Sequence, residues 1–129
     1  MITYDDFKKV EIRAGKILSA EKIQDTDKLI KLMVDFAETK EVASVAVEGQ
    51  EAPVPVKVPA PRQIVSGISA YFPDPAVLAG RTCMFVTNLE PRTIKGHESN
   101  GMLFAVSTAE GAFSLLEPNG TIPAGTKAA

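Results

Sequence analysis

The chain has 129 residues and a formal net charge of −2, with 45% hydrophobic and 23% charged residues, values that are typical of one globular domain spanning residues 1–129. No apolar run approaches the roughly 20 residues of a membrane span, the first residues lack the apolar region of a signal peptide, and the single cysteine, Cys83, excludes an internal disulfide. We therefore expect a cytoplasmic protein without a membrane partner.

The charges are distributed unevenly along the chain. Cations outnumber carboxylates in residues 8–31, whereas carboxylates outnumber cations in residues 32–61. The negative net charge weighs against strong nonspecific binding of nucleic acid, for which a basic domain is typical. It still allows a local basic face.

The first predicted elements follow the N-terminus. Residues 3–9 predict one helical turn capped by Thr3, with acidic side chains in its first turn. From Val10 to Ala14, apolar and charged residues alternate as in a half-buried strand. The alternation breaks at Gly15, which predicts a bulge or a sharp bend there. A turn at residues 25–27 then leads into a second alternating strand at residues 30–36.

Residues 41–61 differ from the rest of the chain. They begin with alternating Ala43, Val45 and Val47 and continue with prolines at positions 53, 55, 59 and 61. Such a density of proline opposes a paired central strand and favours an extended, polyproline-like backbone. We predict a Pro/Val-rich insertion here, which is either an exposed flap or a segment that widens a binding groove or joins a subunit interface.

Three more strands are expected near residues 62–70, 81–89 and 101–107, with a short helix at residues 74–80 that ends in glycine. Short strands separated by turn signals, one of them bent at a glycine, predict a small all-β barrel that is closed or partly open. Periodicity alone leaves an OB-fold and an SH3-like barrel as alternatives.

The segment between the fourth and fifth strands, residues 88–102, reads N-L-E-P-R-T-I-K-G-H-E-S-N-G-M. Its two cations, Arg92 and Lys95, suit contacts with phosphates, because arginine binds them bidentately and lysine is a compact charge. An ordinary loop with solvated charges is the alternative. The segment also holds residues suited to hydrogen bonds or apolar contacts with sugar and bases, namely Ser99, Asn100 and Met102.

The order of residues in this segment resembles the L-x-P-R-x-x-x-G-x-E-S-x-G-M signature of the tRNA-binding domain family. Residues 7–17 resemble the family's F-x-K-V-x-x-R-x-G-x-I opening, residues 27–35 its D-K-L-x-x-L-x-V-D segment, and residues 62–68 its R-Q-I-V-S-G-I strand. The resemblance covers nearly the whole chain except the insertion. That domain is found at the C-terminus of many methionyl-tRNA synthetases and in free-standing dimeric proteins, some of the CsaA type.

The resemblance selects the OB-fold, and implies a five-stranded barrel with short helices and a C-terminal extension. It implies a noncatalytic homodimer that recognises folded tRNA by its shape, with the N-terminal helix and the segment after Ser107 at the subunit interface. Two alternatives remain open: a CsaA-type chaperone that binds peptides or preproteins, and a subunit that tethers tRNA to an aminoacyl-tRNA synthetase. The tRNA-binding residues implied by matched position are Lys31, Arg62, Asn88, Arg92, Lys95, Ser99 and Met102, and Asn100 is added for its hydrogen-bonding side chain.

Enzyme motifs are absent from the sequence, and we expect no catalytic activity, no cofactor and no metal. No P-loop or Rossmann fingerprint occurs, and residues 67–71 lack the second glycine of a nucleophile elbow. Ile30 stands where a calcium loop needs glycine. His97 is the sole histidine and is predicted to be a loop residue, and Cys83 is expected in the core.

Overall fold

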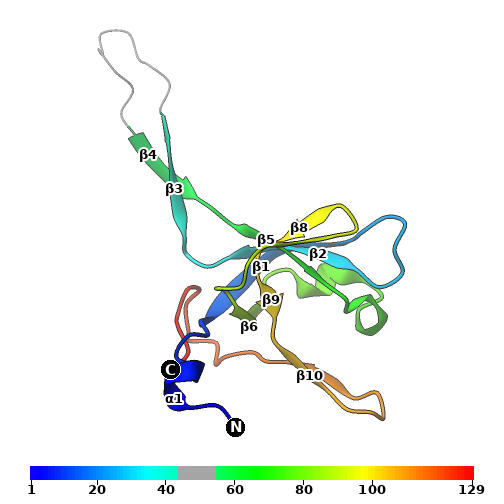
Figure 1. The fold of residues 1–129 in the computed structure, drawn as a ribbon. Coiled ribbons are helices and arrows are strands. Elements are labelled where there is room, and N and C mark those ends of the chain that lie inside the picture. The colour runs from blue at the N-terminus through cyan, green and yellow to red at the C-terminus, as the bar shows by residue number, and fades with distance from the viewer. Residues whose placement is uncertain (44–54) are drawn as a thin grey trace.

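The computed structural model describes residues 1–43 and 55–129 and shows an all-β protein (Figure 1). Five antiparallel strands in the order β5–β2–β1–β6–β9 form one sheet that curves into a nearly closed barrel. The predicted five-stranded OB-fold barrel is therefore confirmed. The strands of the barrel are β1 (Ile12–Lys22), β2 (Ile30–Asp35), β5 (Arg62–Ser66), β6 (Thr82–Val86) and β9 (Met102–Leu103).

In the described part of the chain, three two-stranded ribbons and three short helices accompany the barrel. The ribbons pair β3 (Thr39–Ala43) with β4 (Pro55–Pro59), β7 (Arg92–Ile94) with β8 (His97–Ser99), and β10 (Ala105–Ser107) with β11 (Phe113–Leu115). The helices are α1 (Tyr4–Phe7) and the 3-10 turns η1 (Ser69–Tyr71) and η2 (Pro75–Leu78). Within the two described ranges, no helix has the length and apolar character needed to cross a membrane.

The barrel interior is filled by the apolar side chains that alternation predicted. On β2, Ile30, Leu32 and Val34 are buried, while the residues between them are partly exposed. The Phe36 and Phe85 rings meet edge to face with their centroids 5.3 Å apart, a favourable arrangement for an aromatic pair. The core cluster also contains Ile17, Ile64, Ile68, Leu78, Cys83, Leu103 and Leu115.

The predicted bulge at Gly15 is wrong in position. Strand β1 runs through Gly15 in regular register with β6, and the register irregularity lies between Ile17 and Ser19, where β1 pairs with β2. Gly15 has a different role, because a Cβ atom there would lie 2.5 Å from Cε1 of Phe36 and 2.6 Å from Cγ1 of Val34. The alternation is interrupted at Gly15 because the side chains of Phe36 and Val34 occupy the space that a side chain would need.

The predicted fifth strand, residues 101–107, divides into two elements with different partners. Strand β9 pairs with β6 in the barrel, whereas β10 leaves it and pairs with β11. Alternation cannot reveal this change of partner, because the pattern of apolar residues continues across Phe104. After β11 the chain returns to the barrel, where the Ala14 N–H donates to the Thr126 carbonyl (2.8 Å) and the Ala128 N–H to the Ile12 carbonyl (2.7 Å).

The Pro/Val-rich segment contributes to a ribbon that extends from the barrel between β2 and β5 (Figure 1). The alternation from Ala43 to Val47 falls largely on residues 44–54, which lie outside the described residues. Strand β4 pairs with β3 only and is not a central strand, in agreement with the expectation that proline at this density opposes one. Pro55 and Pro59 are an even number of residues apart and so share one edge of the strand, which leaves the N–H groups of Val56 and Val58 for β3.

Candidate nucleic-acid interface

The signature segment forms a hairpin where a loop was predicted. Strands β7 and β8 pair Arg92 with Ser99 and Ile94 with His97. The two residues between the strands, Lys95 and Gly96, have φ values of 51° and 83°, as a type I′ turn requires. Lys95 is therefore placed at the tip of the hairpin and is exposed. His97 is a strand residue and not the loop residue that was predicted.

Ser99 fixes the far end of the hairpin to the barrel. Its side chain is 5% exposed, and its Oγ accepts a hydrogen bond from the Val65 N–H (3.0 Å) and donates one to the Gly101 carbonyl (3.1 Å). Next to it, the Asn100 N–H donates to the Gln63 carbonyl (2.8 Å). These bonds close the barrel between β5 and the end of β8. The Ser99 hydroxyl, predicted as a contact for RNA, is thus engaged within the chain.

Asn88 ties the near end of the hairpin to the N-terminal segment. Its Oδ1 accepts a hydrogen bond from the Glu11 N–H (2.8 Å), and its Nδ2 donates to the Lys9 carbonyl. Thr87 strengthens the same junction, because its Oγ1 donates to Oε1 of Glu11 (2.6 Å). Both ends of the signature segment are therefore anchored by polar side chains, and the residues between them are displayed.

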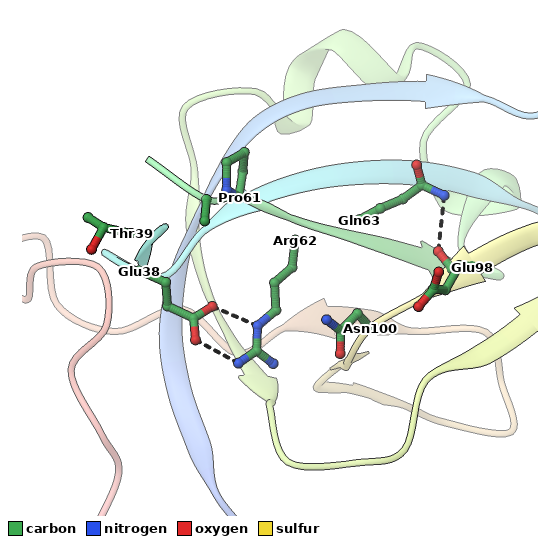
Figure 2. Close-up of a pocket in the computed structure, with 8 residues that line it drawn as sticks. Glu38, Thr39, Pro61, Arg62, Gln63, Glu98 and Asn100 are labelled. Carbon is green, nitrogen blue, oxygen red and sulfur yellow. Dashed lines mark hydrogen bonds and ion pairs between the residues drawn. The ribbon is translucent and has the colours of Figure 1, made fainter. Parts of the chain in front are cut away.

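Arg62 is held by an ion pair at the root of the β3–β4 ribbon (Figure 2). Its Nε and Nη2 donate to the two carboxylate oxygens of Glu38 (2.7 and 2.8 Å), and its Nη1 donates to the Thr87 carbonyl (2.6 Å). The hydrogen bonds to Glu38 and the charge of Glu38 raise the pKa of Arg62, although partial burial opposes them. The guanidinium also lies 5.4 Å from the centre of the Phe36 ring. Arg62 therefore stabilises the fold by joining Glu38 to the Thr87 carbonyl.

Lys31 and Lys95, which are far apart in sequence, border one hollow of about 620 Å³. It lies between the β1–β2 loop and the β7–β8 hairpin, the two loops that OB-folds use for ligands. The Nζ of Lys31 lies 2.8 Å from Oε1 of Glu21, and this neighbour lowers the pKa of the Glu21 carboxyl. Sequence reasoning missed the other residues of the lining, because only the fold brings them here; they include Lys22 and His97 and two carboxylates, Glu21 and Asp25.

Arg92 and Met102 border a smaller crevice of about 110 Å³ beside the hairpin. Met102 is 46% exposed and Leu89 47% exposed, so the crevice has an open apolar side. Asn100 borders a third hollow, at the ribbon root, together with Arg62. Of the eight predicted residues, five display side chains at hollows around the hairpin without serving as anchors: Lys31, Arg92, Lys95, Asn100 and Met102.

The antiparallel barrel, with a hollow between its β1–β2 loop and its β7–β8 hairpin, is an OB-fold domain. The profile of the family described as "Putative tRNA binding domain" matches residues 50–127. The chain belongs to this family.

Comparisons with individual proteins agree with this assignment. A crystal structure of a MetRS related protein from Pyrococcus horikoshii aligns with a TM-score of 0.76 and 34% identity, over 99% of this chain and 97% of that one. The CsaA chaperone protein of Picrophilus torridus aligns with a TM-score of 0.72 and 25% identity, over 100% of both chains. The methionine–tRNA ligase of Methanoregula boonei is 42% identical over 127 residues, which are 98% of this chain but 15% of that enzyme.

Proposed function

We propose that this protein binds tRNA without catalysing a reaction, and that the β7–β8 hairpin and the β1–β2 loop form the contact. The observation that carries this proposal is the shared hollow, where Lys95 at the hairpin tip meets Lys31 and Lys22. The family assignment supports tRNA as the ligand. These three lysines outnumber the two carboxylates of the lining, Glu21 and Asp25, and phosphate contacts with them would release counterions.

A titration of tRNA at several salt concentrations tests this function. We expect saturable binding that weakens with salt and that duplex DNA does not displace. Replacing Arg92 and Lys95 together by alanine should weaken binding about tenfold or more and make the salt dependence shallower, because each lost phosphate contact lowers the slope by roughly one unit.

The matched control replaces Lys16 and Lys40 by alanine, which removes the same charge from two exposed side chains outside the hollows around the hairpin. The control should retain most of the affinity. Equal losses in the two double variants, or unchanged binding in both, would reject the assigned interface.

We also propose that the protein is a homodimer that assembles through α1 and the segment after Ser107. The helix has no buried residue, and Tyr4 and Phe7 on it are 75% and 46% exposed. In Figure 1, α1 lies beside the C-terminus, and on β10 Val106 is 52% exposed. Sedimentation equilibrium should give a dimer mass that Phe7→Ser lowers. A monomer mass at all concentrations would reject the dimer.

The CsaA-type alternative, a chaperone for peptides or preproteins, has one specific observation in its favour. The crevice beside the hairpin exposes Met102 and Leu89, and flexible apolar side chains suit varied peptides. If an unfolded peptide binds to the wild type and tRNA does not at low salt, the chaperone becomes the function.

The relation to methionine–tRNA ligases supports a third arrangement, in which the protein tethers tRNA to a synthetase. The chain corresponds to about 15% of the Methanoregula boonei enzyme. Co-purification with a synthetase tests it.

A cytoplasmic location fits a chain with one cysteine, which forms no internal disulfide. Cys83 is buried, and burial raises the pKa of its thiol to about 11, so the thiol is unreactive.

A further inference from the structure

A polar hollow of about 550 Å³ lies between the root of the β3–β4 ribbon and the end of β8 (Figure 2). Glu38 and Pro61, at the root of the ribbon, border one side of the hollow, and Glu98 of β8 and Asn100 directly after it border the other. Its size is within the usual range of small-molecule sites. The hollow does not contain the lysines of the hairpin tip.

The hydrogen-bonding groups in this hollow divide into engaged and free. Both oxygens of Glu38 accept from Arg62, and Nε2 of Gln63 donates to the Glu98 carbonyl (3.0 Å). Among the described residues, the Glu98 carboxylate and the Asn100 side-chain amide form no hydrogen bond or ion pair, and neither does Oε1 of Gln63. The free acceptors are the Glu98 carboxylate and Oε1 of Gln63, and the free donors are the Asn100 amide and the remaining N–H groups of Arg62, whose charge is already paired with Glu38.

The free donors and acceptors of the hollow can be compared with those of the chemical groups of RNA. A phosphate offers acceptors only and is repelled by the Glu98 carboxylate, whereas adenine and cytosine each offer one exocyclic amine at the Watson–Crick edge. Guanine offers two adjacent donors, N1–H and the N2 amine, beside one acceptor, O6. A carboxylate accepts from both donors at once, and an amide donates to O6.

We infer that this hollow binds an unpaired guanine base of RNA, with Glu98 accepting from N1–H and the N2 amine and Asn100 donating to O6. The inference rests on the proposed function, because RNA is held by the lysines at the other end of β8. The strand separates the two hollows by roughly 10 Å, at about 3.3 Å per residue. That distance is suitable for one chain of RNA whose phosphates meet Lys95 while a neighbouring base turns towards the ribbon root.

Labelled pentanucleotides test the inference on the intact chain at low salt. The probes are UUUUU and the same sequence with a central G, A, C or inosine. We expect the G probe to bind about tenfold more tightly than UUUUU, as for one bidentate base contact. Inosine, which lacks the N2 amine, should lose most of this preference. The inosine result does not depend on any variant folding correctly.

Two single substitutions locate the preference. Glu98→Gln should reduce the preference for G to less than about twofold, because an amide cannot accept two hydrogen bonds from guanine as a carboxylate does. Glu41→Gln is the matched control, since it removes the same charge from an exposed residue of β3 that does not line the hollow. Equal binding of the five probes, or a preference for G that survives Glu98→Gln, overturns the inference. A lysine-rich peptide is tested as a competitor of the G probe. If it displaces the probe from the wild type but not from Glu98→Gln, the hollow is a site for a cationic side chain and the inference is overturned.

The test separates this inference from the proposed function. If tRNA binding depends on Arg92 and Lys95 but no probe is preferred, the function stands and the guanine site is rejected. If the G probe is preferred but tRNA does not bind, the guanine site stands and the tRNA function is rejected.

Discussion

Two of the three ribbons, β7–β8 and β3–β4, are attached to the barrel in opposite ways. The β7–β8 hairpin lies against β5 and is held along its far end by Ser99 and Asn100. The β3–β4 ribbon extends away from the barrel and is held at its root, where Arg62 binds Glu38 and the Ala60 N–H donates to the Glu38 carbonyl (2.9 Å) (Figure 1).

This difference shows that a binding signature contains two kinds of residue. Some polar side chains position the hairpin, and others are displayed by it. The positioning residues are buried or doubly bonded within the chain, as Ser99 is. The displayed residues are exposed cations at the strand and the turn, Arg92 and Lys95. The following predictions test this division, in order of expected effect.

The largest effect is expected at the ribbon root. Arg62→Met should lower the free energy of unfolding by about 3 kcal/mol, because it leaves the partly buried Glu38 carboxylate and the Thr87 carbonyl without their donor. Urea denaturation measures this loss. Adding Glu38→Gln should recover part of the stability, since the uncompensated charge is then absent. If the second change recovers nothing, the ion pair is not the source of the loss.

At the hairpin, Ser99→Ala should lower the free energy of unfolding by about 2 kcal/mol, because the buried Val65 N–H loses its acceptor. Ser107→Ala, at an exposed serine of β10, is the control and should change stability by less than about 0.5 kcal/mol. A Ser99→Ala protein of unchanged stability but reduced tRNA affinity would show that Ser99 is a contact and not an anchor.

Lys95→Asn should change the affinity for tRNA without lowering the stability of the fold, as expected for an exposed residue that does not anchor the hairpin. Asparagine followed by Gly96 favours the positive φ values of this turn, so stability should stay the same or rise by about 0.5 kcal/mol. The affinity for tRNA should fall about threefold, because one phosphate contact is lost. Thermal unfolding and a tRNA titration on the same preparation give both values. A parallel loss of stability and affinity would contradict the assignment of Lys95 as a displayed residue.

The smallest effect concerns acid stability at the junction before the hairpin. The hydrogen bond from Thr87 and, to a lesser extent, the charge of Arg13 lower the pKa of Glu11 below its ordinary value of 4.5, although burial opposes them. A lowered pKa in the folded state stabilises the fold at pH above 4.5, and this contribution disappears as the pH falls through the folded-state pKa. Thr87→Val should therefore flatten the fall in stability below that pH. If the free energy of unfolding of Thr87→Val falls as steeply below pH 4.5 as that of the wild type, Glu11 does not make this contribution.

Much of the fold was accessible from the sequence because it rests on local patterns. Alternation on β2 placed its buried side chains correctly, and the cap of α1 is as predicted, with the Asp6 N–H donating to Oγ1 of Thr3 (3.1 Å). The elements that were wrong depend on which segments meet in the fold, and apolar alternation does not reveal this. Gly15 interrupts the pattern because Phe36 occupies the space beside it, and the strand after Gly101 divides because its second half pairs with β11.

The sequence by itself determined the barrel, its family and the two cations of the signature, because periodicity, turn residues and motif order are properties of nearby positions. Only the tertiary structure decided which polar residues are anchors. The acceptor of the Val65 N–H is 34 residues away in sequence, and the donor to Asn88 is 77 residues away. A hydrogen bond requires partners within about 3 Å, and only folding brings such distant residues together. The same holds for the hollow that Lys31 and Lys95 share.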